Sequence, residues 1–232
     1  MNKRIFISMI AFLLPLISLI FGIYGTFTVT FSIPLLWQVA VRGKDISTLG
    51  IRKDRIWASL AAGLLSGVVL AFLGGTVLKT AGLTGYALDK VTEMNGILRS
   101  LGLDISIKNE LGFRLLRAND RPSIWLASLF YSVLLVGLGE EMFWRGFFQA
   151  KMKNFFPVHV AIWITAAVFG LMHFYLFIII PPLAATALIA VIALLGAFWG
   201  YLYRYFGNIW APAVSHGLIA FISWKYFIFS GS

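Results

Sequence analysis

Long apolar runs, separated by short basic stretches, constrain this sequence more than any other feature. A helix needs about 20 mostly apolar residues to cross a bilayer core of roughly 30 Å, and several runs of that length occur. Backbone groups in lipid must be hydrogen-bonded within the protein, so only helices or closed barrels cross membranes. Because the runs lack the alternation of barrel strands, they predict an all-α, polytopic transmembrane helix bundle.

Composition and charge agree with a membrane protein and argue against a nucleic-acid partner. Hydrophobic residues make up 60% of the 232 residues and charged residues 12%, whereas soluble domains carry about 25% charged residues. The net charge of +10 comes mainly from basic residues in short loops, as is typical of cytoplasmic membrane loops. The bilayer is therefore the expected partner. The sequence has no cysteine, which excludes disulfides, cysteine-bound metals and thiol catalysis.

The apolar runs predict about seven spans. They cover approximately residues 5–24, 27–41, 56–78, 122–151, 157–180, 183–203 and 209–229. The segment 79–121 is polar, and apolar residues at helical spacing within it predict an amphipathic surface helix. The excess of Lys and Arg predicts a multi-pass protein of the cell membrane with its N-terminus and the loop 42–55 in the cytoplasm. Tryptophans and tyrosines are expected mostly at the interfaces or facing lipid.

Two adjacent acids, Glu140 and Glu141, are the only acidic residues inside a predicted span. A charge at mid-bilayer costs about 2.5–3.5 kcal/mol on insertion scales, and such residues usually face the bundle interior and mark a functional site. Arg145 follows Glu141 by four residues, so the two are predicted to form a structural ion pair. Glu140 points about 100° away around the helix. It lacks that partner and is a candidate general base.

All three histidines lie in the C-terminal half. His173 and His216 fall in the predicted fifth and seventh spans, and His159 falls near the interface. At 1.5 Å per residue, Glu140, His173 and His216 lie about 12–24 Å from the same predicted face, so they can converge within the bilayer. Each histidine could instead only hydrogen-bond a neighbouring helix. One carboxylate and two imidazoles could bind a divalent metal such as zinc, or hold a water without metal, and the sequence leaves both open.

Other hydrolytic chemistries do not fit. No aspartate lies in a predicted span, and the His-Glu-x-x-His zinc motif is absent. A Gly-x-Ser-Gly motif of membrane serine proteases is also missing. The nearest stretch, Gly63-Leu64-Leu65-Ser66-Gly67, has one residue too many. A small proton-coupled carrier would also use intramembrane Glu, Arg and His, but no inverted repeat is visible.

Three motifs resemble those of the CPBP family, which includes CAAX prenyl proteases and Abi proteins. They are Glu140-Glu141-x-x-x-Arg145, then Phe169-x-x-x-His173, then Gly200 to Tyr203 with Asn208 to Pro212 and His216. The resemblance covers about residues 122–221 and divides the chain into N-terminal helices (1–121) and a catalytic core (122–232). It implies an intramembrane endopeptidase that hydrolyses membrane-associated or lipidated peptide substrates.

The resemblance also implies roles for individual residues. Glu140 would activate water, His173 would help to hold it, and His216 would donate to the developing oxyanion. Glu141, Arg145 and Phe169 would support the site. One position departs from the family pattern, because Ala220 stands where an Asn is usual, four residues after His216. The loss of that donor favours an alternative, a non-catalytic scaffold, regulator or bacteriocin-immunity protein of the same family. The oligomeric state is not predicted.

Overall fold

The computed structural model describes residues 43, 45–83, 93, 100, 122–223 and 225. The predicted spans at 5–24 and 27–41, most of the predicted amphipathic segment and the end of the last span lie outside these residues. The regular elements of the described part are all helices, which confirms the all-α prediction there. They are η2 (Ile46–Leu49), α4 (Ile56–Thr80), α7 (Pro122–Phe130), η4 (Tyr131–Gly139), η5 (Met142–Gln149), α8 (Ala150–Met152), α9 (Val158–Leu171), α10 (Leu176–Ile179), α11 (Pro182–Phe206) and α12 (Trp210–Ile222).

Membrane-spanning potential belongs to three helices of the described part. Ile56–Thr80, Pro122–Met152 and Pro182–Phe206 are long and apolar enough to cross a bilayer. Val158–Leu171 and Trp210–Ile222 are shorter apolar helices. Large apolar side chains such as Leu65 and Leu183 remain 70% and 84% exposed, as expected of surfaces that face lipid. The total of about seven spans stays a prediction.

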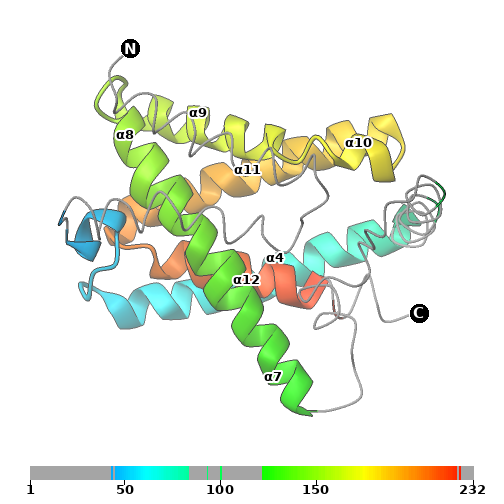
Figure 1. Ribbon diagram of the computed structural model, residues 1–232, viewed down its shortest axis with the longest axis horizontal. Coiled ribbons are helices and arrows are strands. Elements are labelled where there is room, and N and C mark those ends of the chain that lie inside the picture. Colours follow the sequence, from blue (N-terminus) through cyan, green and yellow to red (C-terminus); the bar gives the residue numbers. More distant parts are fainter. Residues whose placement is uncertain are drawn as a thin grey trace.

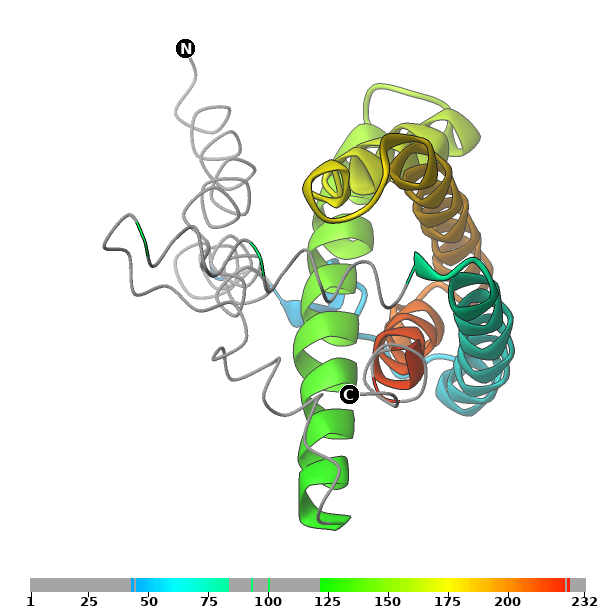
Figure 2. The same ribbon diagram turned by 90° about the vertical axis from the view of Figure 1, so that its right-hand side faces the viewer.

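The long helix Pro122–Met152 crosses the other helices obliquely, whereas α4, α9, α11 and α12 run along the long axis of the molecule (Figures 1 and 2). It begins as α7 and ends as α8, as expected for the predicted fourth span. Between them, η4 and η5 are π-helical, and they flank Glu140 and Glu141. π-Helical turns are wider than α-helical turns and occur frequently at functional sites.

Small residues let α4 pack closely on α12. Its buried positions recur every fourth residue: Ser59, Gly63, Gly67, Ala71 and Gly75. A Cβ atom on Gly63 would lie 2.6 Å from the Ala211 carbonyl oxygen, and one on Gly67 would lie 2.9 Å from the Leu218 Cβ. Backbones therefore touch directly, as in the small-residue interfaces of membrane helices. The division at residues 121 and 122 stays a prediction, but α4 packs on α12 across it.

The predicted fifth span is wrong in one respect, because the helix is broken. Helix α9 ends at Leu171, turns occupy residues 172–175, and the short helix α10 follows. In an α-helix the backbone N–H of His173 would donate to the Phe169 carbonyl. Here the His173 ring Nδ1 takes that carbonyl at 2.9 Å, and the backbone N–H donates to Gly170 instead. His173 therefore lies in a turn.

Candidate functional site

The two acids sit where η4 and η5 cross α12, and glycines set the distance between these helices. A Cβ atom on Gly137 would collide with the Ala213 carbonyl oxygen, and one on Gly217 would lie 2.5 Å from the Val133 Cα. No larger residue fits at either position without moving a backbone. This close approach brings His216 of α12 against Glu141, although 75 residues separate them in sequence.

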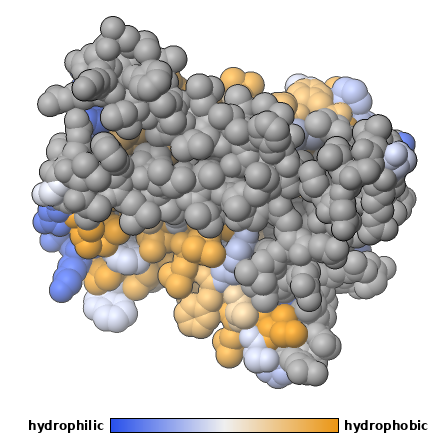
Figure 3. All heavy atoms as spheres, in the orientation of Figure 1, coloured by the Kyte–Doolittle hydropathy of each residue, from blue (hydrophilic) through white to orange (hydrophobic). Residues whose placement is uncertain are grey.

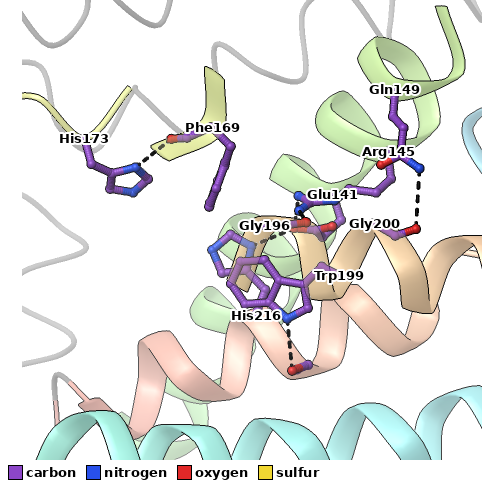
Figure 4. A network of polar contacts seen from close by, with 10 residues as sticks. Glu141, Arg145, Gln149, Phe169, His173, Gly196, Trp199, Gly200 and His216 are labelled. Carbon is purple, nitrogen blue, oxygen red and sulfur yellow. Dashed lines mark hydrogen bonds and ion pairs between the residues drawn. The ribbon is translucent and has the colours of Figure 1, made fainter. Parts of the chain in front are cut away.

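Glu141 is the centre of a buried polar network. Its Oε1 accepts a hydrogen bond from Arg145 Nη1 at 2.7 Å, which is the predicted ion pair, and lies 3.0 Å from His216 Nδ1. Arg145 Nη2 donates to the Gly196 carbonyl of α11 at 2.7 Å. Glu141 and Arg145 are both 0% exposed. The pair thus holds three elements together, since η5, α11 and α12 each supply a partner (Figure 4).

Two side chains, Trp199 and Glu141, hold the ring of His216. Its ring stacks on Trp199 with centroids 4.3 Å apart and an interplanar angle of 20°. Trp199 is fixed in turn, because its Nε1 donates to Ser215 Oγ at 3.1 Å. Figure 4 shows the stack beneath the Glu141–Arg145 pair. The ring is therefore fixed by a carboxylate on one nitrogen and by an indole on its face.

Phe169 stands between the two histidines. Its ring meets His173 edge-on at 5.1 Å and His216 at 5.7 Å, and the Arg145 guanidinium lies 5.4 Å from its centroid. His173 is half-buried at the end of α9. The structure therefore brings His173 and His216 to the same aromatic side chain, on opposite sides of it.

Glu140 differs from Glu141 in having no such partner. The side chain is buried, with 6% exposure, and within the described part of the chain its carboxylate makes no hydrogen bond or ion pair. The ionisable side chains near it are those of His216, Glu141 and Arg145. The acid without a direct partner is thus the one that the helical spacing predicted.

Sequence reasoning missed Trp199. The residue lies within a predicted span and was expected, like most tryptophans of this chain, to face lipid or an interface. Instead it is 2% exposed. The available signal was a pair of glycines, Gly196 about one turn before Trp199 and Gly200 directly after it. Gly196 lies close to α9, and Gly200 lies close to side chains of α9 and η5.

Asn208 and Ala220 complete the account of the third motif. Asn208 Nδ2 donates to the Asp54 carbonyl at 2.6 Å, and Asn208 Oδ1 accepts from Ser59 at 2.6 Å and from the Trp210 N–H at 3.1 Å. This amide therefore ties α4 to the start of α12, away from Glu141. Ala220 lies half-buried one turn after His216 and brings no polar group.

A metal-binding arrangement is not formed by the side chains that the structure describes. In that part of the chain, no three His, Cys, Asp or Glu residues are grouped so that they could hold a metal ion. The set Glu140, His173 and His216, considered from the sequence as ligands, is therefore not assembled as one. Nδ1 of each histidine is already engaged, by Phe169 and by Glu141.

Comparison with known proteins assigns the C-terminal half. A scan of protein families matches residues 122–222 to the type II CAAX prenyl endopeptidase Rce1-like family, nearly the range over which the motifs were recognised. No curated protein and no solved structure matches the chain. The matched range contains Glu140, Glu141, Arg145, Phe169, His173 and His216 and all elements that build the network around them. Residues 122–222 therefore form a domain of the Rce1-like type II CAAX prenyl endopeptidase family.

Proposed function

We propose that this protein is an intramembrane endopeptidase in which Glu140 activates the water that attacks the peptide bond. One observation carries the proposal: Glu140 is a buried carboxylate without a hydrogen-bond partner in the described structure, whereas the neighbouring Glu141 is bound through Oε1 to both Arg145 and His216. A general base must be free to take a proton. The endopeptidase family of residues 122–222 supports the same chemistry.

Glu141 is unsuited to the role of base. Its Oε1 already contacts a guanidinium and an imidazole, and proton transfer to it would weaken the buried ion pair with Arg145, which is costly. The two neighbouring acids therefore have different proposed roles. Glu141 positions His216 and anchors Arg145, and Glu140 handles the proton of the attacking water.

His216 can stabilise an oxyanion only with a proton on Nε2. Its Nδ1 lies 3.0 Å from Glu141 Oε1. A carboxylate oxygen only accepts hydrogen bonds, so a bond between these atoms uses the proton on Nδ1, and donation to an oxyanion needs a further proton on Nε2. A preplaced donor of this kind contributes about 10²–10³-fold to the rate.

His173 is proposed to hold the water. A carbonyl oxygen only accepts hydrogen bonds, so the contact with Phe169 identifies Nδ1–H as the donor. In the neutral ring Nε2 then carries a lone pair, which can accept a hydrogen bond from a water or from the substrate. In this proposal, the water held by His173 is the one from which Glu140 takes a proton, and the step itself needs no metal. A divalent metal on the same groups remains a separate outcome of the test below.

The proposed substrates are peptide bonds of membrane-associated or lipidated proteins. The prenylated class follows from the family alone. We also propose a multi-pass arrangement of about seven spans with the N-terminus in the cytoplasm, on the basis of the charged loops.

A second function of another class is favoured by Ala220. Because the usual amide donor is missing one turn after His216, the oxyanion would rely on His216. A non-catalytic regulator, scaffold or bacteriocin-immunity protein would have lost that donor without penalty.

The test uses purified full-length protein in liposomes with three peptides: a prenylated CAAX peptide, its unprenylated form and an unmodified transmembrane peptide. Glu140→Gln should lower the rate of cleavage about 10²–10⁴-fold. Asp54→Asn, which also replaces a carboxylate by an amide but at an exposed position, should leave the rate unchanged. Equal cleavage by wild type and Glu140→Gln would reject Glu140 as the base. Lack of any cleavage by the wild type would favour the non-catalytic function. A chelator added to active wild type decides the role of metal.

A further inference from the structure

At one end of the helix bundle, the segment before α4 and the α11–α12 connection are hydrogen-bonded to each other. The Ile209 N–H donates to the Gly50 carbonyl at 3.0 Å, and Trp210 Nε1 donates to the Arg52 carbonyl at 2.8 Å. Arg55 Nη1 donates to the Tyr205 carbonyl at 3.0 Å. The segment before α4 and the α11–α12 connection therefore form one surface, and the α8–α9 connection lies at the same end of the molecule (Figure 1).

Exposed cations gather on this surface, which we call the basic end. It consists of Arg52, Lys53, Arg55, Lys151, Lys153 and Arg204. The acids of the same connections are Asp45 and Asp54, and Asp45 accepts a hydrogen bond from the Ser47 N–H. Within the described residues, Arg52, Lys53, Arg55, Lys153 and Arg204 form no ion pair with a carboxylate. In the part of the chain that the structure describes, no carboxylate therefore compensates the charge of these five cations.

The chemistry around Arg204 also favours an anion. Its Nη1 lies 2.5 Å from His159 Nε2, and His159 Nδ1 lies 3.1 Å from the Tyr201 hydroxyl. All of these groups can donate hydrogen bonds or carry positive charge, and none is an acid. A phosphate group would supply the negative charge that this cluster lacks, and its oxygens could accept hydrogen bonds from the remaining N–H groups of Arg204.

Aromatic side chains border the basic end on its apolar side. Trp57 is 81% exposed in the first turn of α4, Phe155 is 74% exposed in the α8–α9 connection, and Tyr205 is 67% exposed in the last turn of α11. Aromatic rings of this kind sit at the headgroup level of membranes. Figure 3 shows hydrophilic residues at this end of the molecule directly beside hydrophobic helix surface. This combination of cations and exposed aromatic rings is the one expected of a protein surface at the level of lipid headgroups.

We propose that the basic end binds the headgroups of acidic phospholipids. The aromatic border selects a lipid over a nucleic acid or a soluble acidic protein, because it places the cations next to acyl chains. Each Lys or Arg near an acidic membrane surface contributes about fivefold in affinity. The binding is independent of the peptidase chemistry, since none of these cations belongs to the network of Glu141 and His216.

The test is lipid binding to the full-length protein in a neutral detergent, counted by native mass spectrometry. Phosphatidylglycerol should bind more tightly than phosphatidylcholine with the same acyl chains, and added salt should weaken it. Lys153→Gln should lower the affinity for phosphatidylglycerol about fivefold, and Lys53→Gln with Lys153→Gln about 25-fold. Lys153→Arg, which keeps the charge, should bind like the wild type.

The matched control is Lys79→Gln, the same substitution at the last turn of α4, at the opposite end of the bundle. It should leave the affinity unchanged. An equal loss in Lys79→Gln, or equal binding of the two lipids, would overturn the proposal. Displacement of the lipid by inorganic phosphate or by a short oligonucleotide, at an ionic strength at which sodium chloride does not displace it, would also overturn it, because the site would then recognise an anion outside the membrane.

Discussion

Helix α12 meets α4 on one side and η4 on the other, and small residues make both contacts. On the α4 side, Gly63 and Gly67 approach the backbone of Ala211 and Ser215. On the η4 side, Gly137 and Gly217 bring the two backbones together in the same way. By packing alone, the two contacts cannot be told apart.

The polar groups distinguish them. On the α4 side, Ser59 donates to Asn208 and accepts from the Ala211 N–H at 2.8 Å. Across the other contact, the described structure gives no partner to the Glu140 carboxylate, and Glu141 Oε2 and Ser132 Oγ are buried without hydrogen bonds. A buried polar group without a partner costs about 1–3 kcal/mol. The contact between η4 and α12, which contains such unpaired polar groups, is therefore the better candidate for the functional site.

The largest effect should come from Glu140→Gln, which removes a carboxylate next to the contact between η4 and α12. Activity should fall by about 10²–10⁴-fold, while the melting temperature stays equal or rises, because a neutral amide is less costly to bury than a carboxylate. Thermal unfolding in detergent and peptide cleavage would be measured on the same preparation. A clear fall in melting temperature would mean that Glu140 is structural, and the contrast between the two contacts would be lost.

Arg145→Met removes the ion pair between Arg145 and Glu141. It leaves the Glu141 carboxylate buried without its cation and leaves the Gly196 carbonyl without its donor. The free energy of unfolding should therefore fall by about 3–5 kcal/mol. Denaturant titration of purified protein would measure this. The double variant Glu141→Gln/Arg145→Met should recover part of the loss, because no unpaired charge remains. If the double variant is as unstable as the single one, the ion pair is not what stabilises the crossing.

Ser59→Ala tests the contact between α4 and α12, where the polar groups of Ser59 are hydrogen-bonded. It removes the donor to Asn208 and the acceptor of the Ala211 N–H, so stability should fall by about 1–3 kcal/mol. Cleavage per folded molecule should change little. Ser66→Ala is the control, because the Ser66 hydroxyl donates only to carbonyls of its own helix. A loss of cleavage beyond the loss of folded protein would show that α4 acts on the site through α12.

Local spacing predicted the parts of the site that lie within one helix. The i,i+4 relation of Glu141 and Arg145 gave the ion pair, and the 100° offset of Glu140 separated it from that pair. The family motifs gave the range of the domain. These features depend on neighbouring residues, which a sequence displays directly.

Features that depend on contacts between distant segments escaped prediction. Gly63 and Gly67 were compared with a serine protease motif, but they are packing positions, and Ser66 between them donates to the Ala62 carbonyl of its own helix at 2.7 Å. The break after α9 also escaped, because apolar composition continues through it while the His173 side chain displaces the backbone hydrogen bond. In a chain that is apolar almost throughout, hydropathy does not distinguish a helix that faces lipid from one that faces protein.

The smallest effect should come from Trp199→Phe, which tests how precisely His216 must be held. Phe keeps an aromatic face for the ring of His216 but loses the hydrogen bond from Nε1 to Ser215. Removing one such bond costs about 0.5–1.5 kcal/mol, so cleavage should fall by about two- to tenfold with KM unchanged. Trp199→Ala, which also removes the stack and leaves a cavity, should cost more in both stability and rate. If Trp199→Phe cleaves like the wild type, the hydrogen bond from Trp199 to Ser215 is not needed for catalysis. The contact with Glu141 and an aromatic face from α11 would then suffice to orient His216.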